Sequence, residues 1–102
     1  MKISFFNSTV HDYLVSLEKP TYSKVLKQIK LLENFGYQLT MPYSKPISHN
    51  LYELRIRGQQ EIRIFYCFHH GQIYLLHAFA KKTQKTPHHE IETAQKRISL
   101  LT

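Results

Sequence analysis

The chain has 102 residues, a length typical of one domain, and we expect a single domain over residues 1–102. Its 14 Lys and Arg residues outnumber its 7 Asp and Glu residues, and the resulting formal net charge of +7 indicates an anionic partner such as nucleic acid or acidic lipid. The 42% content of hydrophobic residues excludes a disordered chain, and the single cysteine excludes an internal disulfide and a cysteine-rich zinc site.

The first third of the chain predicts a short strand followed by two helices. The apolar segment Lys2–Phe6 is typical of an edge strand. A helix should follow from a cap near Asn7, because apolar residues recur at helical spacing until Pro20 stops the run. A second helix should begin near Thr21 and end near Gly36, since glycine commonly follows a helix C-terminus. These two helices predict a helical hairpin.

After this hairpin the apolar pattern changes from helical spacing to strands. Gln38–Asn50 contains two prolines and is interpreted as a loop. The segments Leu51–Arg57, Glu61–Phe68 and Gln72–Ala80 predict an antiparallel meander of three strands, because they are rich in β-branched and aromatic residues between turn signals. Thr86–Pro87 should open a final helix, with the threonine as cap and the proline in first position. The order of elements predicts an α+β fold.

Alternation along the meander strands predicts one polar sheet face that carries cations. If the strands pair in simple register, this face gathers Arg55, Arg57, Arg63, His77 and Lys81. Guanidinium groups bind phosphate bidentately, and an imidazole can transfer protons near pH 7. Phe79, Tyr52 and Tyr66 offer rings on which RNA bases can stack, although the parity of Tyr66 also fits a core residue.

Simpler interpretations of the same residues remain open at this point. Arg55 and Arg57 can pair with Glu53 and Glu61 on a solvated face that has no ligand. His77 lies within an apolar strand, where spacing alone favours a structural histidine with satisfied hydrogen bonds slightly over a catalytic one. Sequence spacing does not decide between these alternatives.

The strongest motifs lie in the second half of the chain and resemble a known family. They are Leu51–Arg55, Arg63–Tyr66, Leu76–Pro87 and Glu90–Ala94 with Arg97, and the loop Pro42–Lys45 precedes them. Together they resemble the phage-derived, HigB-like branch of the RelE toxin superfamily. The resemblance covers most of the chain and implies a RelE-like fold with an N-terminal strand and helical hairpin, a three-stranded meander and a C-terminal helix.

The resemblance implies a toxin of a type II toxin–antitoxin system that acts as an endoribonuclease. Such toxins cleave mRNA, typically on the translating ribosome next to 16S rRNA, with neither a metal nor another cofactor. The 2′-hydroxyl of the substrate attacks the neighbouring phosphate, which requires a base, an acid and cations around the phosphate. The expected partners are therefore mRNA, the ribosome and a cognate antitoxin, often a helix-turn-helix protein.

Roles for individual residues follow from matching them to the family motif. The resemblance implies that Arg55 and Arg63 stabilise charge and orient phosphate, and that His77 and Lys81 are candidates for proton transfer. Contacts to the RNA are expected from Lys45, Arg57, Phe79, Lys82 and Lys85.

Three other functions are compatible with the sequence. One is a non-catalytic RNA- or DNA-binding module that uses the same basic face, and another is a toxin homologue that has lost activity. A metal enzyme is suggested by His69–His70 and His88–His89, but adjacent histidines diverge and no ligand spacing accompanies them, so we expect no metal site. We also expect a cytoplasmic protein without a membrane partner, since neither a signal peptide nor a membrane-spanning run is present.

Overall fold

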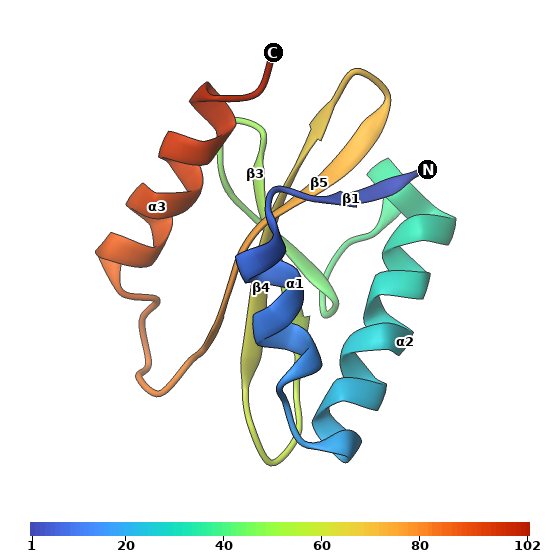
Figure 1. Ribbon diagram of the computed structural model, residues 1–102, viewed down its shortest axis with the longest axis vertical. Helices are drawn as coiled ribbons and strands as arrows, with labels where there is room; N and C mark the ends of the chain where they lie inside the picture. Colours follow the sequence, from blue (N-terminus) through green and yellow to red (C-terminus); the bar gives the residue numbers. More distant parts are fainter.

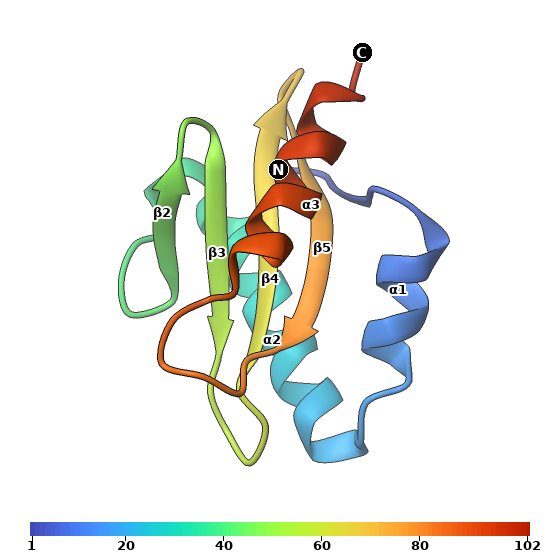
Figure 2. The same ribbon diagram turned by 90° about the vertical axis from the view of Figure 1, so that its left-hand side faces the viewer.

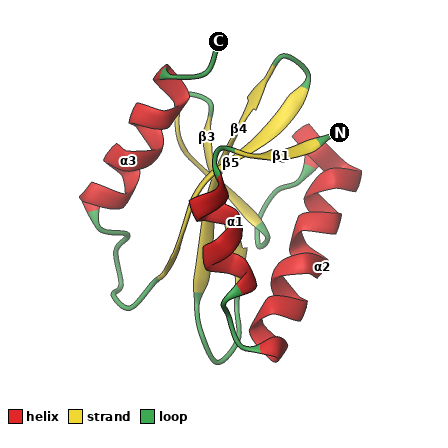
Figure 3. Cartoon of the chain, viewed as in Figure 1, coloured by secondary structure: helices red, strands yellow, loops and turns green.

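The computed structural model describes residues 1–102 as one mixed β-sheet with helices on both faces (Figure 1). The strands are β1 (Ile3–Phe5), β2 (Ser44–Ser48), β3 (Leu51–Ile56), β4 (Ile62–His69) and β5 (Gln72–Ala80). The helices are α1 (Ser8–Val15), α2 (Lys19–Phe35) and α3 (His88–Ser99), with a short 3-10 turn at Gly36–Gln38 (Figure 3). The spatial order is β1-β5-β4-β3-β2, so the α+β prediction is confirmed.

The N-terminal elements follow the predicted order, with one shifted boundary. β1 lies at the edge of the sheet as predicted, parallel to β5. The side chain of Asn7 caps α1 by accepting a 3.1 Å hydrogen bond from the amide of Val10. α2 begins before the predicted start at Thr21, because Pro20 fits in its first turn, where a missing N–H breaks no helical bond. α2 ends at Phe35, so Gly36 follows it directly as predicted, with a positive φ of +51° that glycine adopts readily.

The prediction of a loop at Gln38–Asn50 is wrong in part, because β2 lies within it. β2 pairs antiparallel with β3 and places Lys45 opposite Glu53. Pro46 lacks an amide hydrogen, but β2 is an edge strand and one of its sides needs no ladder partner. The register shifts directly after this proline. The predicted meander is therefore the centre of a five-stranded mixed sheet.

A bulge in the β4–β5 pair corrects the predicted alternation along the last strand. Phe65 is opposite His77, whereas Tyr66 is opposite Leu75, so Leu76 has no partner in β4. Leu75 consequently joins the core on one face, while the His77 ring stacks beside Phe65 on the other. Strict alternation would place Leu75 and His77 on the same face, but the extra residue shifts the strand by one position.

Two hydrophobic clusters attach the helices to the sheet. Figure 2 shows α3 in front of the sheet and α2 behind it. The cluster beneath α1 and α2 contains Val10, Leu14, Val25, Leu32, Leu54, Ile56, Ile62, Ile64, Tyr66, Ile73, Leu75 and Ala78. The cluster beneath α3 contains Leu51, Phe65, Cys67, Leu76, Phe79 and Ala94. Each large apolar side chain in them contributes roughly 1.5–3 kcal/mol on burial.

The start of α3 differs from the predicted cap. α3 begins at His88 directly after Pro87, and no side chain caps it. The hydroxyl of Thr86 instead donates a 3.1 Å hydrogen bond to Glu53 Oε2 in β3, which fixes the end of the β5–α3 loop to the sheet. None of the three helices combines the length and the apolar character that crossing a bilayer would require.

Candidate functional site

A polar cleft opens where β3, β4 and the segment after β5 meet. Its volume is about 510 Å³, and none of the residues that line it is hydrophobic. Five cationic side chains and one carboxylate line it, so the cleft favours an anionic ligand. We call it the basic cleft, and its residues are Arg55, Arg57, Glu61, Arg63, Lys81, Lys82, Thr83 and Gln84.

Arg63 is the most enclosed cation of the basic cleft. Its side chain is 2% exposed, and its Nη1 donates a 3.1 Å hydrogen bond to the carbonyl of Ile62. Nη2 donates a 3.1 Å bond to Glu61 Oε1, and Nε lies 3.6 Å from Glu53 Oε1. A buried guanidinium persists only when it is paired, so these two carboxylates hold Arg63 in one orientation.

Arg55 lies directly opposite Arg63 in the β3–β4 ladder and shares a carboxylate with it. Arg55 Nε is 3.8 Å from Glu53 Oε1, and Nη1 donates to the sulfur of Met41 at 3.6 Å. Like charges directly across a ladder repel, and the Glu53 carboxylate offsets this because it lies near both guanidinium groups. The side chain of Glu53 is 3% exposed, so its carboxylate acts from inside the protein.

Glu61 is the single carboxylate on the lining of the basic cleft. It accepts hydrogen bonds from Arg63 and from the amide of Gly58 at 3.3 Å, and its Oε1 lies 3.6 Å from Arg57 Nη1. Burial opposes ionisation, but the hydrogen bonds from Arg63 and Gly58 and the charges of Arg63 and Arg57 lower the pKa of Glu61. The group is therefore an anion at neutral pH.

The lysine segment after β5 forms the remaining side of the cleft. The amide of Lys81 donates a 2.7 Å hydrogen bond to the carbonyl of Glu61, which extends the β4–β5 pairing by one position. Lys81 is half-buried and Lys82 is exposed. This segment therefore faces the three arginines across the cleft, as strand alternation predicted for Lys81.

His77 shares the sheet face of these arginines but does not line the basic cleft. Its Nε2 lies 2.8 Å from Glu90 Oε1 in α3, and its ring lies beside those of Phe65 and Phe79 at centroid distances of 6.5 and 5.7 Å. The side chains of His77 and Glu90 are 19% and 17% exposed. His77 therefore has Glu90 as a structural partner, which is one of the two alternatives that sequence spacing left open.

Of the five predicted RNA-contacting residues, two line the basic cleft and three lie outside it. Arg57 and Lys82 line the cleft, whereas Lys45 is exposed on β2 and Lys85 is exposed in the β5–α3 loop. Phe79 is 6% exposed and belongs to the cluster under α3, so its ring packs rather than facing solvent.

The two tyrosines considered for base stacking lie on the opposite face of the sheet. Tyr66 is 1% exposed, and its hydroxyl is hydrogen-bonded to Ser44. Tyr52 stacks on Tyr66 with a centroid distance of 5.4 Å, at the edge of the α1–α2 cluster. The core position suggested by the parity of Tyr66 is confirmed.

Sequence reasoning missed the structural importance of the two carboxylates. The expected pairings of Arg55 with Glu53 and of Arg57 with Glu61 are confirmed, but the idea of a solvated face is wrong for Glu53, which is buried. The sequence signal for the burial of Glu53 was its position as an acidic residue between the apolar residues Tyr52 and Leu54 of a strand. Thr83 and Gln84, which also line the cleft, lie within the motif Leu76–Pro87, but no role was predicted for them.

The histidine pairs that suggested a metal do not form a ligand set. No three His, Cys, Asp or Glu side chains come together in a geometry that can hold a metal ion. His69 and His70 stack edge to face with each other, and His88 and His89 lie near Glu92 and Glu90 respectively, at 3.6 Å in each case.

Comparison with known proteins gives one family. A family model of phage-derived Gp49-like proteins (DUF891) matches residues 12–99, which is most of the chain. No curated protein matches the chain significantly. The Gp49-like family is part of the RelE/ParE-like toxin superfamily of toxin–antitoxin systems, so the match supports the expected superfamily without distinguishing its HigB-like branch. The α+β fold and the match together show that the chain belongs to the Gp49-like family of phage-derived proteins.

Proposed function

We propose that this protein is an endoribonuclease toxin that cleaves mRNA at the ribosome without a metal. The observation that carries the proposal is the basic cleft, in which five cations surround a space of about 510 Å³. A phosphodiester brings the negative charge that this space favours, and arginine is the side chain best suited to clamp it. Membership of a toxin superfamily supports the same function.

In the proposed reaction, the 2′-hydroxyl of the RNA attacks the adjacent phosphorus. The bond from phosphorus to the 5′-oxygen breaks and leaves a 2′,3′-cyclic phosphate and a 5′-hydroxyl. The attacking hydroxyl passes its proton to the ionised Glu61 carboxylate, and Lys81 protonates the departing oxygen. Arg55 and Arg63 stabilise the charge that accumulates on the phosphate oxygens.

The exposure of the arginines suggests how they divide this work. Arg57 has a side chain that is 59% exposed, so it is free to reach a phosphate oxygen directly. Arg63 is nearly enclosed and contributes mainly a fixed positive charge behind the cleft. His77 lies outside the lining of the cleft, so we assign it to positioning α3 through Glu90 rather than to proton transfer.

Induced expression in bacteria with mapping of mRNA 5′ ends tests the proposal. We expect growth arrest and cuts that are phased to codons, because a toxin that acts on the ribosome cleaves in the decoding frame. Cuts without codon phase would refute the ribosome dependence but keep the nuclease. Intact growth with intact mRNA, at a confirmed level of folded protein, would refute the proposed activity.

Variants of the cleft separate catalysis from simple RNA binding. Arg55→Ala combined with Lys81→Ala should lower the cleavage rate by roughly 100-fold or more, the scale of losing one preorganised charge at a transition state. Lys96→Ala on α3 removes one exposed charge outside the cleft and serves as the control. A double variant with the cleavage rate of the control would refute the assignment.

We also propose that the cognate antitoxin is a helix-turn-helix protein that blocks the basic cleft. The positive charge of the cleft suits an acidic segment of such a protein. Co-expression of the antitoxin should restore growth and abolish the mapped cuts. An antitoxin that binds tightly while cleavage continues would contradict this proposal.

A further inference from the structure

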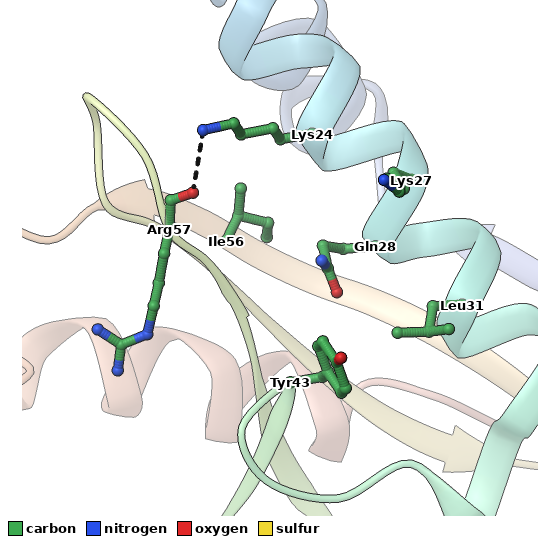
Figure 4. Close-up of a pocket in the computed structure, with 7 residues that line it drawn as sticks. All are labelled: Lys24, Lys27, Gln28, Leu31, Tyr43, Ile56 and Arg57. Atoms are coloured by element: carbon green, nitrogen blue, oxygen red, sulfur yellow. Dashed lines mark hydrogen bonds between the residues drawn. The ribbon is translucent and has the colours of Figure 1, made fainter.

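A second pocket, of about 400 Å³, lies between α2 and the end of β3 (Figure 4). We call it the α2 pocket. Lys24, Lys27 and Gln28 reach it from one face of α2, because residues three and four positions apart are neighbours on a helix. Tyr43 and Ile56 line it from the side of the sheet.

The α2 pocket has positive charge without a counter-ion. No acidic residue lines it, and neither Lys24 nor Lys27 forms an ion pair. The ammonium of Lys24 donates only to the backbone carbonyl of Arg57, at 3.4 Å. By contrast, Lys30 on the same helix pairs with Glu33 at 3.1 Å. The pocket therefore holds two unneutralised cations at its rim.

The rest of the lining suits a flat, polar-edged group. Tyr43 is 43% exposed, and Ile56, at 1% exposure, forms an apolar floor. Figure 4 shows the amide of Gln28 extending from α2 into the space between the helix and Tyr43. Gln28 Oε1 is buried without a hydrogen-bond partner, so a shift of this side chain toward the pocket would let a donor from a ligand satisfy it. A nucleobase offers both a stacking face and amino donors on its edge.

The α2 pocket and the basic cleft are adjacent through Arg57, which lines both. Its carbonyl holds Lys24, while Figure 4 shows its guanidinium extending away from α2, and this group lies 3.6 Å from Glu61 of the cleft. The carbonyl of Tyr43 accepts a 2.8 Å bond from the amide of Arg55, which ties the second pocket to the cleft at another point. A single strand in the cleft can thus continue over Arg57 to α2.

We propose that the α2 pocket binds one nucleotide of single-stranded RNA that flanks the cleaved bond. Its phosphate lies against Lys24 and Lys27, and its base lies between Tyr43 and Gln28. A volume of about 400 Å³ is within the range of roughly 300–1,000 Å³ that ligand pockets occupy. That this nucleotide flanks the cleaved bond rests on the proposed nuclease function, whereas its binding in the α2 pocket does not.

Binding of a fluorescent single-stranded RNA whose 2′-oxygens are all methylated tests the pocket, because this probe cannot be cleaved by 2′-hydroxyl attack. Lys24→Ala with Lys27→Ala is compared with Lys30→Ala with Lys96→Ala, and both pairs lower the formal net charge from +7 to +5. We expect the first pair to weaken binding at least tenfold relative to the control pair. Its salt dependence should also become shallower, by about 0.7 in the log–log slope for each phosphate that the variant no longer neutralises.

A second variant tests the base without changing charge. Tyr43→Leu should weaken binding by about 5- to 150-fold through loss of stacking, with an unchanged salt slope. Circular dichroism and thermal unfolding check that each variant is folded. Equal affinity of the two double lysine variants for the RNA probe would overturn the proposal. If inhibition by the antitoxin weakened while this affinity stayed equal, the proposal would also be overturned, because the pocket would then bind an acidic protein segment.

The results distinguish this inference from the proposed function. Lysine-dependent binding of the probe by a protein that produces no mRNA cuts in cells would support the α2 pocket and refute the nuclease. Codon-phased cuts with equal binding by the two lysine pairs would support the nuclease and overturn the α2 pocket. Absence of RNA binding by the unaltered protein would overturn the pocket.

Discussion

Replacement of Glu53 by glutamine should destabilise the fold through the arginines of the cleft. Glu53 is 2% exposed, and its Oε1 lies 3.6 Å from Arg63 and 3.8 Å from Arg55. Its Oε2 accepts the hydrogen bond of Thr86 from the loop before α3. Glutamine keeps the shape of the side chain but removes its negative charge, so the buried Arg63 would retain Glu61 as its single carboxylate partner.

The expected size of the effect follows from this loss of pairing. Removing one partner of a buried ion pair costs about 3–5 kcal/mol, because the other charge stays buried without compensation. Arg63 keeps its 3.1 Å contact with Glu61, so we expect the lower end, about 3 kcal/mol. A protein of this size is stable by about 5–15 kcal/mol. The melting temperature should fall by roughly 10–25 °C.

Urea unfolding followed by circular dichroism measures this change, with the slope m checked for constancy. Glu92→Gln is the matched control, because Glu92 is an exposed carboxylate whose contact with His88 is 3.6 Å long. Exposed pairs contribute about 0–1 kcal/mol, so the control should remain close to the unaltered protein. A loss below about 1 kcal/mol for Glu53→Gln would refute the view that this carboxylate holds the arginines in place.

Four smaller predictions concern other sites. Burial raises the pKa of the Cys67 thiol to about 11, so a thiol reagent at pH 8 should modify it only after unfolding, and rapid native modification would contradict this. Asn7→Ala should cost about 0.5–2 kcal/mol in urea unfolding through loss of the α1 cap, whereas an unchanged midpoint would discount the cap. Tyr66→Phe should cost about 0.5–1.5 kcal/mol through its hydrogen bond to Ser44, and no loss would contradict that bond. Because folding lowers the pKa of Glu61 below its ordinary value of 4.5, the ionised carboxylate stabilises the fold above pH 4.5, and this stability is lost as the pH falls through the pKa of the folded state. Glu61→Gln should therefore make the free energy of unfolding less sensitive to acid. An identical dependence of stability on pH in the two proteins would count against the lowered pKa.

Local patterns in the sequence were sufficient for most elements of the fold, but not for pairings set by distant residues. Apolar periodicity and the residues near Asn7 and Gly36 predicted the helices, because helix contacts and caps are local. β2 was missed because prolines interrupt its pattern, and only its place beside β3 makes it a strand. The bulge at Leu76 was also invisible, since it depends on how β5 aligns with Phe65 and Tyr66 in β4.

The cleft shows the same limit at the level of side chains. Alternation in β3 and β4 predicted that Arg55, Arg57 and Arg63 share a face, and the register confirms this. Alternation does not indicate what covers that face. Thr86, in the loop before α3, donates a hydrogen bond to Glu53, and the ion pair expected at the surface is a buried one. Thr86 is 33 positions away from Glu53 along the chain, so local alternation does not indicate it.

The pairing of Arg63 with Glu53 and Glu61 has a consequence for the proposed binding of an anion in the cleft. Ordering a long side chain on binding costs about 0.5–1.5 kcal/mol, and Glu53 and Glu61 have already ordered Arg63 when the protein folds. Arg57 differs, because its 3.6 Å contact with Glu61 is exposed and contributes little, so it can move onto a phosphate at small cost. The buried pairing therefore supplies a rigid positive floor, and the exposed arginine supplies the adjustable contact. In the function we propose, an RNA strand that enters the cleft would displace the weak ion pair and leave the structural one intact.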